Sequence, residues 1–181
     1  GNGESRNIFP IDNLKGHEKG FPPVENWNPD LCIGPEFKID REGDWYYDNS
    51  QIKNTKLINL FASVLKKEKQ KYYLVTPVEK ILVNVDLAPY KIIDFEIINE
   101  NIKFITNLNY DFYLDKNHST RLIEIDDALL PLVNVRSNIE GFINRNTYYK
   151  LIDFALEKNF KYKNDLYVPS FNKNHIIGKI A

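Results

Sequence analysis

The feature that most constrains the fold is a pattern that occurs twice in the chain. Residues 54–62 (NTKLINLFA) resemble residues 146–155 (NTYYKLIDFA), and residues 73–77 (YLVTP) resemble residues 166–169 (LYVP). The offset is the same for both parts (150 − 56 = 94 for the aligned lysines, 167 − 73 = 94 for the aligned tyrosines). Each copy reads as a capped helix, a charged turn and a Tyr-containing strand that a proline ends. Two copies are too few for a solenoid, so the repeat predicts two small lobes packed together, each with a helix and antiparallel strands.

The first of the two helices is predicted from its apolar spacing. Asn54 or Thr55 is a suitable N-cap, and the apolar side chains that follow recur at i, i+3, i+4, i+7 and i+8. This apolar stripe consists of Leu57, Leu60, Phe61, Val64 and Leu65. Lysines between residues 66 and 71 would then lie at the helix C-terminus, where cations suit the dipole. Asn146 or Thr147 is expected to cap the second helix.

Strands account for most of the remaining pattern, so the predicted fold class is α+β. Residues 37–40 and 45–47 form a hairpin, because apolar and polar residues alternate around a Gly-containing turn. Further strands are expected near residues 72–76, 80–86, 90–98, 102–106, 110–114 and 120–125, and around residues 132–136, with a last hairpin at 165–177. The predicted organisation is a tail over residues 1–20, an N-terminal lobe over 21–82 and a C-terminal lobe over 83–181. The proline-rich residues 21–29 should be extended.

Composition excludes several classes of function. Lys and Arg number 24 against 25 Asp and Glu, so the surplus of positive charge that DNA or RNA binding requires is missing. No apolar run approaches the roughly 20 residues of a membrane span, and no signal peptide is expected. The single cysteine, Cys32, excludes an internal disulfide and favours a cytoplasmic location; we expect it to be buried as a small apolar residue.

Chemical motifs are few. There is no G-x-G-x-x-G, P-loop, H-E-x-x-H or G-x-S-x-G pattern, and the three histidines have no metal-like spacing. We therefore expect no cofactor, no metal site and no catalytic residue. The stretch TPVEK at residues 76–80 remains as a candidate, because a proline interrupts a strand there and an acid–base pair follows. Glu79 and Lys80 would point to opposite faces of a continuing strand, and a solvated strand start is the alternative interpretation.

Two arginines and a histidine are the other candidates. Arg121 and Arg136 lie at predicted strand positions and have the side chain best suited to bidentate contacts with phosphate or carboxylate. The alternative is a cross-strand ion pair, for example with Glu124 or Asp126. His118 could act as an acid or base near neutral pH, or it could be a surface or capping group in a turn.

Several of these residues also carry a resemblance to a known family. The motifs are Trp27-Asn28-Pro29, Gly43 with Trp45 and Tyr47, LFA at 60–62, LVTPVEK at 74–80, Asp86, APY at 88–90, Thr106-Asn107, His118 with Arg121, Val135-Arg136, Tyr148-Tyr149 and Gly178. In these, the chain resembles the bacterial family called domain of unknown function 1285 over roughly residues 20–180. The resemblance implies a duplicated α+β core, a C-terminal part superficially like a pleckstrin-homology fold, and binding of a nucleotide-like ligand between the two halves in signal transduction.

These observations favour a non-enzymatic ligand-binding or sensory module. We expect a small anionic ligand at the interface between the lobes, with Thr76, Glu79, Lys80, Asn107, His118, Arg121 and Arg136 nearby. Arg and Lys would hold the anion, Glu79 a hydroxyl or amine, and Asn107 would supply directional hydrogen bonds. Two alternatives stay open: a hydrolase or transferase that uses Glu79 or His118 as a base, and a protein-interaction scaffold.

Overall fold

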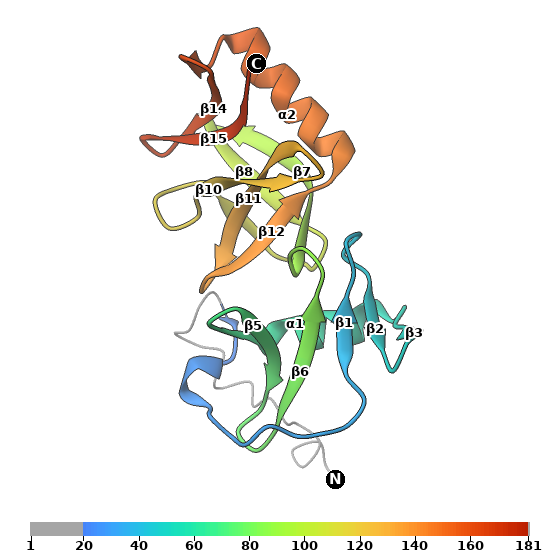
Figure 1. Cartoon of the computed structure of the whole chain (residues 1–181). Helices are drawn as coiled ribbons and strands as arrows, with labels where there is room; N and C mark the ends of the chain where they lie inside the picture. Colours follow the sequence, from blue (N-terminus) through green and yellow to red (C-terminus); the bar gives the residue numbers. More distant parts are fainter. Residues whose placement is uncertain (1–19, 181) are drawn as a thin grey trace. The chain divides into compact units, whose positions relative to one another are not determined.

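The computed structural model describes residues 20–180, and within them the chain divides into two compact units between Leu87 and Ala88 (Figure 1). The expected tail over residues 1–20 lies almost wholly outside the described residues. The expected lobe boundary at residues 82/83 falls inside a strand, Lys80–Val85, whose pairing belongs entirely to the sheet of the first unit. Within residues 20–180 the protein is therefore α+β, with two units made mostly of strands and one α-helix in each.

The first unit is a six-stranded sheet with the strand order β3-β2-β1-β6-β5-β4. All of its pairings are antiparallel except that of β1 with β6. Its elements are the 3-10 helix η4 (Val24–Asn26), β1 (Phe37–Ile39), β2 (Trp45–Tyr47), β3 (Ser50–Gln51), α1 (Thr55–Ser63), β4 (Leu65–Glu68), β5 (Lys71–Val75) and β6 (Lys80–Val85).

Helix α1 begins as predicted and ends earlier. The Asn54 side chain accepts a hydrogen bond from the Leu57 N–H, as expected of an N-cap. The helix packs on the core face of β1 and β2, where the ring of Phe61 lies 4.9 Å from that of Phe37. The prediction that the apolar stripe runs on to Leu65 is wrong, because the helix stops at Ser63 and Leu65 starts β4. The lysines that follow belong to the β4–β5 hairpin.

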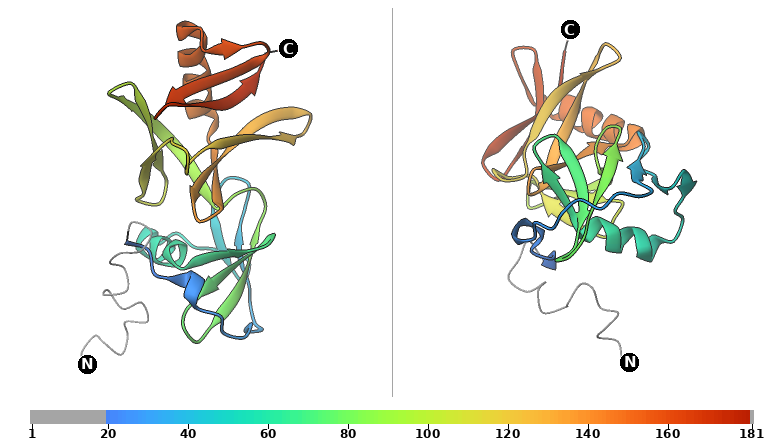
Figure 2. Two further views of the ribbon diagram at one scale, coloured as in Figure 1. Left: turned by 90° about the vertical axis from the view of Figure 1, so that its left-hand side faces the viewer. Right: turned by 60° about the horizontal axis from the view of Figure 1, so that its bottom comes forward.

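The second unit has a six-stranded sheet, β10-β11-β12-β7-β8-β9, and a three-stranded sheet, β13-β14-β15. Only the β12–β7 pairing is parallel. Helix α2 packs beside β14 and β7 (Figure 2). The elements are β7 (Tyr90–Ile98), β8 (Asn101–Thr106), β9 (Asp111–Tyr113), β10 (Thr120–Ile125), β11 (Ala128–Arg136), β12 (Ile139–Ile143), α2 (Arg145–Lys158), β13 (Lys161–Tyr162), β14 (Asp165–Ser170) and β15 (Lys173–Lys179).

The N-cap of helix α2 lies two residues before Asn146, the first of the two predicted caps. Asn144 is the N-cap, and its side chain accepts from the Thr147 N–H at 2.9 Å. The hydroxyl of Thr147 instead donates to the Ile93 carbonyl, which ties the helix to β7. In both units an α-helix is followed by a short antiparallel strand pair, β4–β5 after α1 and β13–β14 after α2.

Gly141 on β12 lies where there is no room for a side chain. A Cβ atom there would lie 3.0 Å from Tyr90 Cβ, 3.1 Å from Val135 Cγ2 and 3.2 Å from the Tyr90 carbonyl oxygen. Gly141→Ala should lower the free energy of unfolding by about 1–2 kcal/mol, since overpacking forces neighbouring atoms apart. Urea denaturation checks this, with Gly34→Ala as the control because a Cβ there meets nothing within 4 Å. Equal stability of the two variants would contradict the prediction.

Candidate functional site: an acidic pocket on the first sheet

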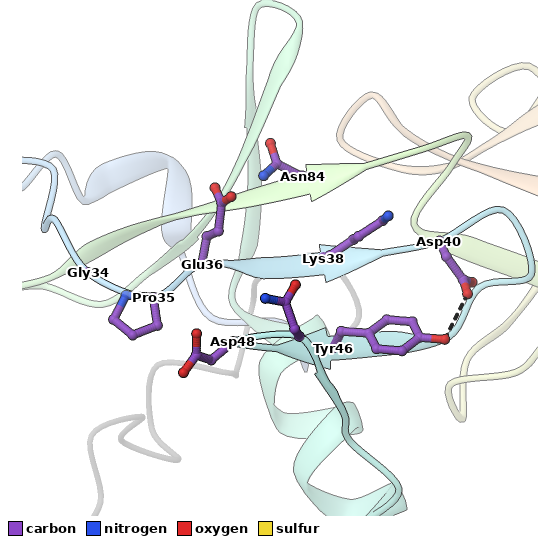
Figure 3. A pocket seen from close by; sticks show the side chains of 9 residues that line it. Gly34, Pro35, Glu36, Lys38, Asp40, Tyr46, Asp48 and Asn84 are labelled. Carbon is purple, nitrogen blue, oxygen red and sulfur yellow. Dashed lines mark hydrogen bonds between the residues drawn. The ribbon is translucent and has the colours of Figure 1, made fainter.

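A pocket of about 480 Å³ lies on the first unit, on the face of the sheet opposite α1 (Figure 3). We call it the acidic pocket; it is lined by Gly34, Pro35, Glu36, Lys38, Asp40, Tyr46, Asp48, Asn49 and Asn84. Its floor follows from strand alternation, since Phe37 and Ile39 point into the core and Lys38 between them points outward. Lys38 is in register with Tyr46 on β2 and with Asn84 on β6. One polar row therefore crosses three strands.

The carboxylates stand at the ends of these strands. Glu36 precedes β1, Asp40 follows it, and Asp48 follows β2. Asp48 and Asn49 both have positive φ values, 49° and 68°, in the tight turn between β2 and β3. Within residues 20–180, the side chains of Glu36 and Asp48 form no hydrogen bond or ion pair, so their oxygens are available as acceptors.

Asp40 has a structural role as well. Its Oδ1 accepts from the backbone N–H groups of Glu42 and Asp44 at 3.0 and 2.9 Å, which closes the β1–β2 turn. The Tyr46 hydroxyl donates to its Oδ2 at 3.1 Å. This hydrogen bond to Asp40 raises the pKa of Tyr46, with smaller contributions from burial and from the charges of Asp40 and Asp44. Tyr46 is therefore a neutral hydroxyl at one end of the pocket, with its proton donated to Asp40 and its oxygen left as an acceptor.

The charge of the pocket is negative. It contains three carboxylates and one ammonium, and the Lys38 ammonium also lies 3.6 Å from the carboxylate of Asp86 outside the lining. Carboxylates only accept hydrogen bonds, so the lining presents an excess of acceptors and suits a ligand rich in donors. Sequence reasoning missed this site. The predicted hairpin of residues 37–47 did indicate it, because the pairing of that hairpin places Lys38 and Tyr46 side by side on the outward face of the sheet.

Of the predicted ligand-binding residues, three lie in the first unit, and the side chains of two of them, Thr76 and Lys80, are engaged in internal contacts. Thr76 is buried, and its hydroxyl oxygen accepts from the N–H groups of Val78 and Glu79. The Glu79 side chain is exposed. The Lys80 ammonium donates to Glu68 Oε1 at 2.7 Å and lies 4.4 Å from the centre of the Tyr73 ring. Neither Glu79 nor Lys80 lines the acidic pocket.

The other four lie in the second unit. The backbone N–H of Asn107 donates to the Lys91 carbonyl, and the side-chain oxygen of Asn107 accepts from the Lys91 N–H. Arg121 is exposed and forms a bidentate ion pair with Glu140 on β12, at 2.8 and 2.9 Å. Arg136 is buried and donates to the Tyr90 hydroxyl at 3.2 Å. The cross-strand pairing weighed for Arg121 is present, with Glu140 as its partner.

His118 closes a turn with Asp115. Its Nδ1 is hydrogen-bonded to Asp115 Oδ1 at 2.9 Å, and its ring lies 5.1 Å from that of Phe112. Burial raises the pKa of the Asp115 carboxyl, but hydrogen bonds from His118 and from the Asn117 N–H more than offset this, so the pKa lies below its usual value. The pair is a turn-closing contact, in agreement with the capping interpretation of His118.

Three further findings concern site types considered from the sequence. In the described part of the chain, no group of three or more His, Cys, Asp or Glu residues could hold a metal ion. No helix there is long and apolar enough to cross a bilayer. The expectation that Cys32 is buried is wrong: its side chain is exposed, because only its backbone is tied to the sheet, through an N–H that donates to the Lys80 carbonyl.

Comparison with known proteins identifies relatives of both units. The model of the N-terminal domain of the domain of unknown function DUF1285 matches residues 22–88, and that of the DUF1285 C-terminal domain matches residues 89–177. The crystal structure of a DUF1285 family protein from Silicibacter pomeroyi DSS-3 is similar with 27% identity and a TM-score of 0.82, over 92% of this chain and 93% of that one.

A second crystal structure, of a DUF1285 family protein from Shewanella baltica OS155, is 30% identical with a TM-score of 0.55, over 66% of this chain and 91% of that one. No curated protein matches the chain. Since the two domain models together span nearly all of the described residues, the chain belongs to the DUF1285 family.

Proposed function

We propose that this protein is a ligand-binding module whose first unit binds a small molecule bearing an ammonium group and hydroxyls in the acidic pocket. The observation that carries the proposal is the pair of unengaged carboxylates, Glu36 and Asp48, in one hollow with Tyr46, whose hydroxyl proton goes to Asp40 and whose oxygen can accept from a ligand. The pocket lies within the range of about 300–1,000 Å³ that is usual for small-molecule sites. A sensory role in signalling is the function that such binding would serve.

Charge decides the class of ligand. An ammonium group near Glu36 and Asp48 gains charge-assisted hydrogen bonds, which are about twice as strong as neutral ones. A phosphate would meet the same carboxylates and only one cation, Lys38, which Asp86 already partly neutralises. The acidic pocket therefore supports an amine rather than the anionic, nucleotide-like ligand that the sequence suggested.

The earlier expectation of an anionic ligand stays a prediction that needs its own support. Of the cations named for it, Lys80 and Arg121 are each paired with a carboxylate within their own unit, and Arg136 is buried and donates to the Tyr90 hydroxyl. An anion would have to compete with these pairs, which lowers the affinity that the cations can supply. The alternative of a hydrolase or transferase that uses Glu79 or His118 as a base also stays a prediction; the Glu79 side chain is exposed, and His118 Nδ1 is hydrogen-bonded to Asp115.

The test is binding of glucosamine, with N-acetylglucosamine as the uncharged counterpart, followed by amide chemical shifts and thermal stability. A ligand present at about 100 times its Kd stabilises the folded state by about 2.7 kcal/mol. Glucosamine should shift amides of β1, β2 and β6 and raise the Tm. The Glu36→Gln, Asp48→Asn double variant should weaken binding about tenfold, since each charge-assisted hydrogen bond contributes about 1.5–3 kcal/mol before solvent screening.

Glu25→Gln is the matched control, because Glu25 is an exposed acid in η4 outside the pocket. It changes the net charge by one without touching the site and should leave binding unchanged. If both sugars bind equally well, or if the double variant binds glucosamine as tightly as the unmodified protein, the proposal is wrong.

A further inference from the structure

The second unit contains a different kind of pocket, of about 520 Å³, which the acidic pocket and the proposed function do not involve. We call it the apolar pocket. Its lining comes from β7, the β7–β8 turn, α2, the residue after the α2 cap, and β14. The residues are Ile97, Glu100, Phe154, Lys158, Phe160 and Pro169.

The end of helix α2 builds the aromatic wall. Asn159 adopts the left-handed conformation, with φ 59° and ψ 40°, and ends the helix. The chain then turns back, so that the Phe160 N–H donates to the Ala155 carbonyl at 2.9 Å. A hydrophobic contact across such a cap is common, and here the rings of Phe154 and Phe160 meet edge to face at 5.7 Å.

Hydrogen bonds of β14 and the residue after it fix the opposite wall. Ser170, at the end of β14, accepts from the Ile102 N–H at 3.0 Å and donates to the Leu114 carbonyl at 2.8 Å. The Phe171 N–H donates to the Asn101 side chain at 2.8 Å. These bonds tie β14, and with it Pro169, to the start of β8 and thus to the β7–β8 turn that contains Glu100. The pocket is therefore preformed by the fold of the second unit.

The two charged residues of the lining have opposite signs. Glu100 lies in the β7–β8 turn and Lys158 in the last turn of α2, and both are exposed. Across the described residues, neither side chain forms an ion pair or a hydrogen bond. The lining thus combines an apolar interior with one unpaired carboxylate, which can accept hydrogen bonds, and one unpaired ammonium, which can donate them. The net charge of the lining is zero.

This arrangement matches one class of ligand. We infer that the apolar pocket binds a small zwitterion with an apolar side group, in particular a free aromatic amino acid. The ring packs against Phe154, Phe160 and Pro169, where aromatic pairs gain stability beyond area burial. The ammonium pairs with Glu100 and the carboxylate with Lys158. A fatty acid would leave Glu100 without an ammonium partner, and an apolar amine would leave Lys158 without a carboxylate partner. In each case the unpaired residue also repels the charge of the ligand.

The experiment uses the full chain and phenylalanine as the probe, with amide chemical shifts as the readout. Phenylalanine should shift amides of residues 97–100 and 154–160 and of Val168 and Ser170, which flank Pro169. Glu100→Gln and Lys158→Gln should each weaken binding about threefold to tenfold, the range expected for a charge contact at a solvent-exposed rim. Glu157→Gln, an exposed neighbour on α2 outside the lining, should change nothing.

Two altered probes separate the charges. N-acetylphenylalanine lacks the ammonium, so its affinity should respond to Lys158→Gln and not to Glu100→Gln. Phenylalaninamide lacks the carboxylate and should respond in the opposite way. The inference is overturned if phenylalanine at millimolar concentration shifts no pocket amide, or if neither variant changes its affinity. Pocket amides that shift on dilution of the protein alone would overturn it in favour of a second copy of the chain as the occupant.

Discussion

Arg136→Ala is expected to lower the free energy of unfolding of the second unit by about 3–5 kcal/mol, the range for breaking a buried charged contact or emptying a large core site. The Arg136 side chain is 2% exposed and is among the largest fully buried side chains. Its Nε donates to the hydroxyl of Tyr90, which is itself buried. Truncation removes that donor and leaves a cavity between β11 and β7.

Arg121→Ala is the matched control, because it removes the same chemical group from the same sheet. The Arg121 side chain is 59% exposed and that of its partner Glu140 is 15% exposed, so removal of Arg121 should cost about 1 kcal/mol, well below the loss for Arg136→Ala. Urea denaturation, followed by hydrogen exchange in β7 and β11, measures both variants. If Arg136→Ala is no less stable than Arg121→Ala, Arg136 does not hold the core. Its candidacy as a ligand-binding residue would then gain support.

Most elements of the fold could be predicted from local pattern, because strands and caps depend on near neighbours. The β7–β8 turn is an example: Asn99 and Glu100 have φ values of 51° and 67°, and Asn tolerates that region well. The error at the end of α1 has a physical cause. Val64 and Leu65 continue a helical stripe and also suit a buried strand, and no local signal separates the two at that length.

The candidate site was harder to predict, because partners across strands depend on register. Lys80 pairs with Glu68 and Arg121 with Glu140, across distances of 12 and 19 residues in the chain. Sequence alone identified the cations and missed the carboxylates that neutralise them. The acidic pocket has the same origin, since Lys38, Tyr46 and Asn84 become neighbours only once β1 is placed between β2 and β6.

The burial of Lys66 could not be predicted from the sequence either. A lysine-rich stretch predicts a solvated surface, yet Lys66 is only 8% exposed. Its ammonium donates to the Trp27 carbonyl at 3.1 Å and to the Asn28 side chain at 3.0 Å, and it pairs with Glu68 at 3.1 Å. Glu68 therefore lies between two lysines, Lys66 and Lys80, and this cluster ties the segment at residues 27–28 to the edge of the first sheet.

Glu68→Gln should lower the free energy of unfolding near neutral pH by about 2 kcal/mol. This lies between the losses for exposed pairs, about 0–1 kcal/mol, and for fully buried pairs, about 3–5 kcal/mol. An intermediate value is expected because the Lys66, Lys80 and Glu68 side chains are 10%, 18% and 28% exposed. The amide keeps the shape of the carboxylate, so the loss reports its charge.

The pH dependence separates charge from packing. The hydrogen bond from Lys80 lowers the pKa of Glu68 below 4.5, burial opposes this, and Lys66 lowers it further. A carboxyl with a lowered pKa in the folded state contributes stability above its unfolded pKa and loses that contribution as the pH falls through the folded value. The unmodified protein and Glu68→Gln should therefore differ most near neutral pH and converge in acid.

Urea denaturation of both proteins at neutral pH and well below pH 4.5 measures this convergence, with Glu96→Gln as the control. Glu96 pairs with Lys103 at 4.0 Å and is 54% exposed, so its substitution should change stability little at either pH. A loss in Glu68→Gln that is equal at both pH values would mean that packing of the side chain, and not its charge between the two lysines, stabilises the edge of the sheet. Lys80 would then again be available as a cation for an anionic ligand.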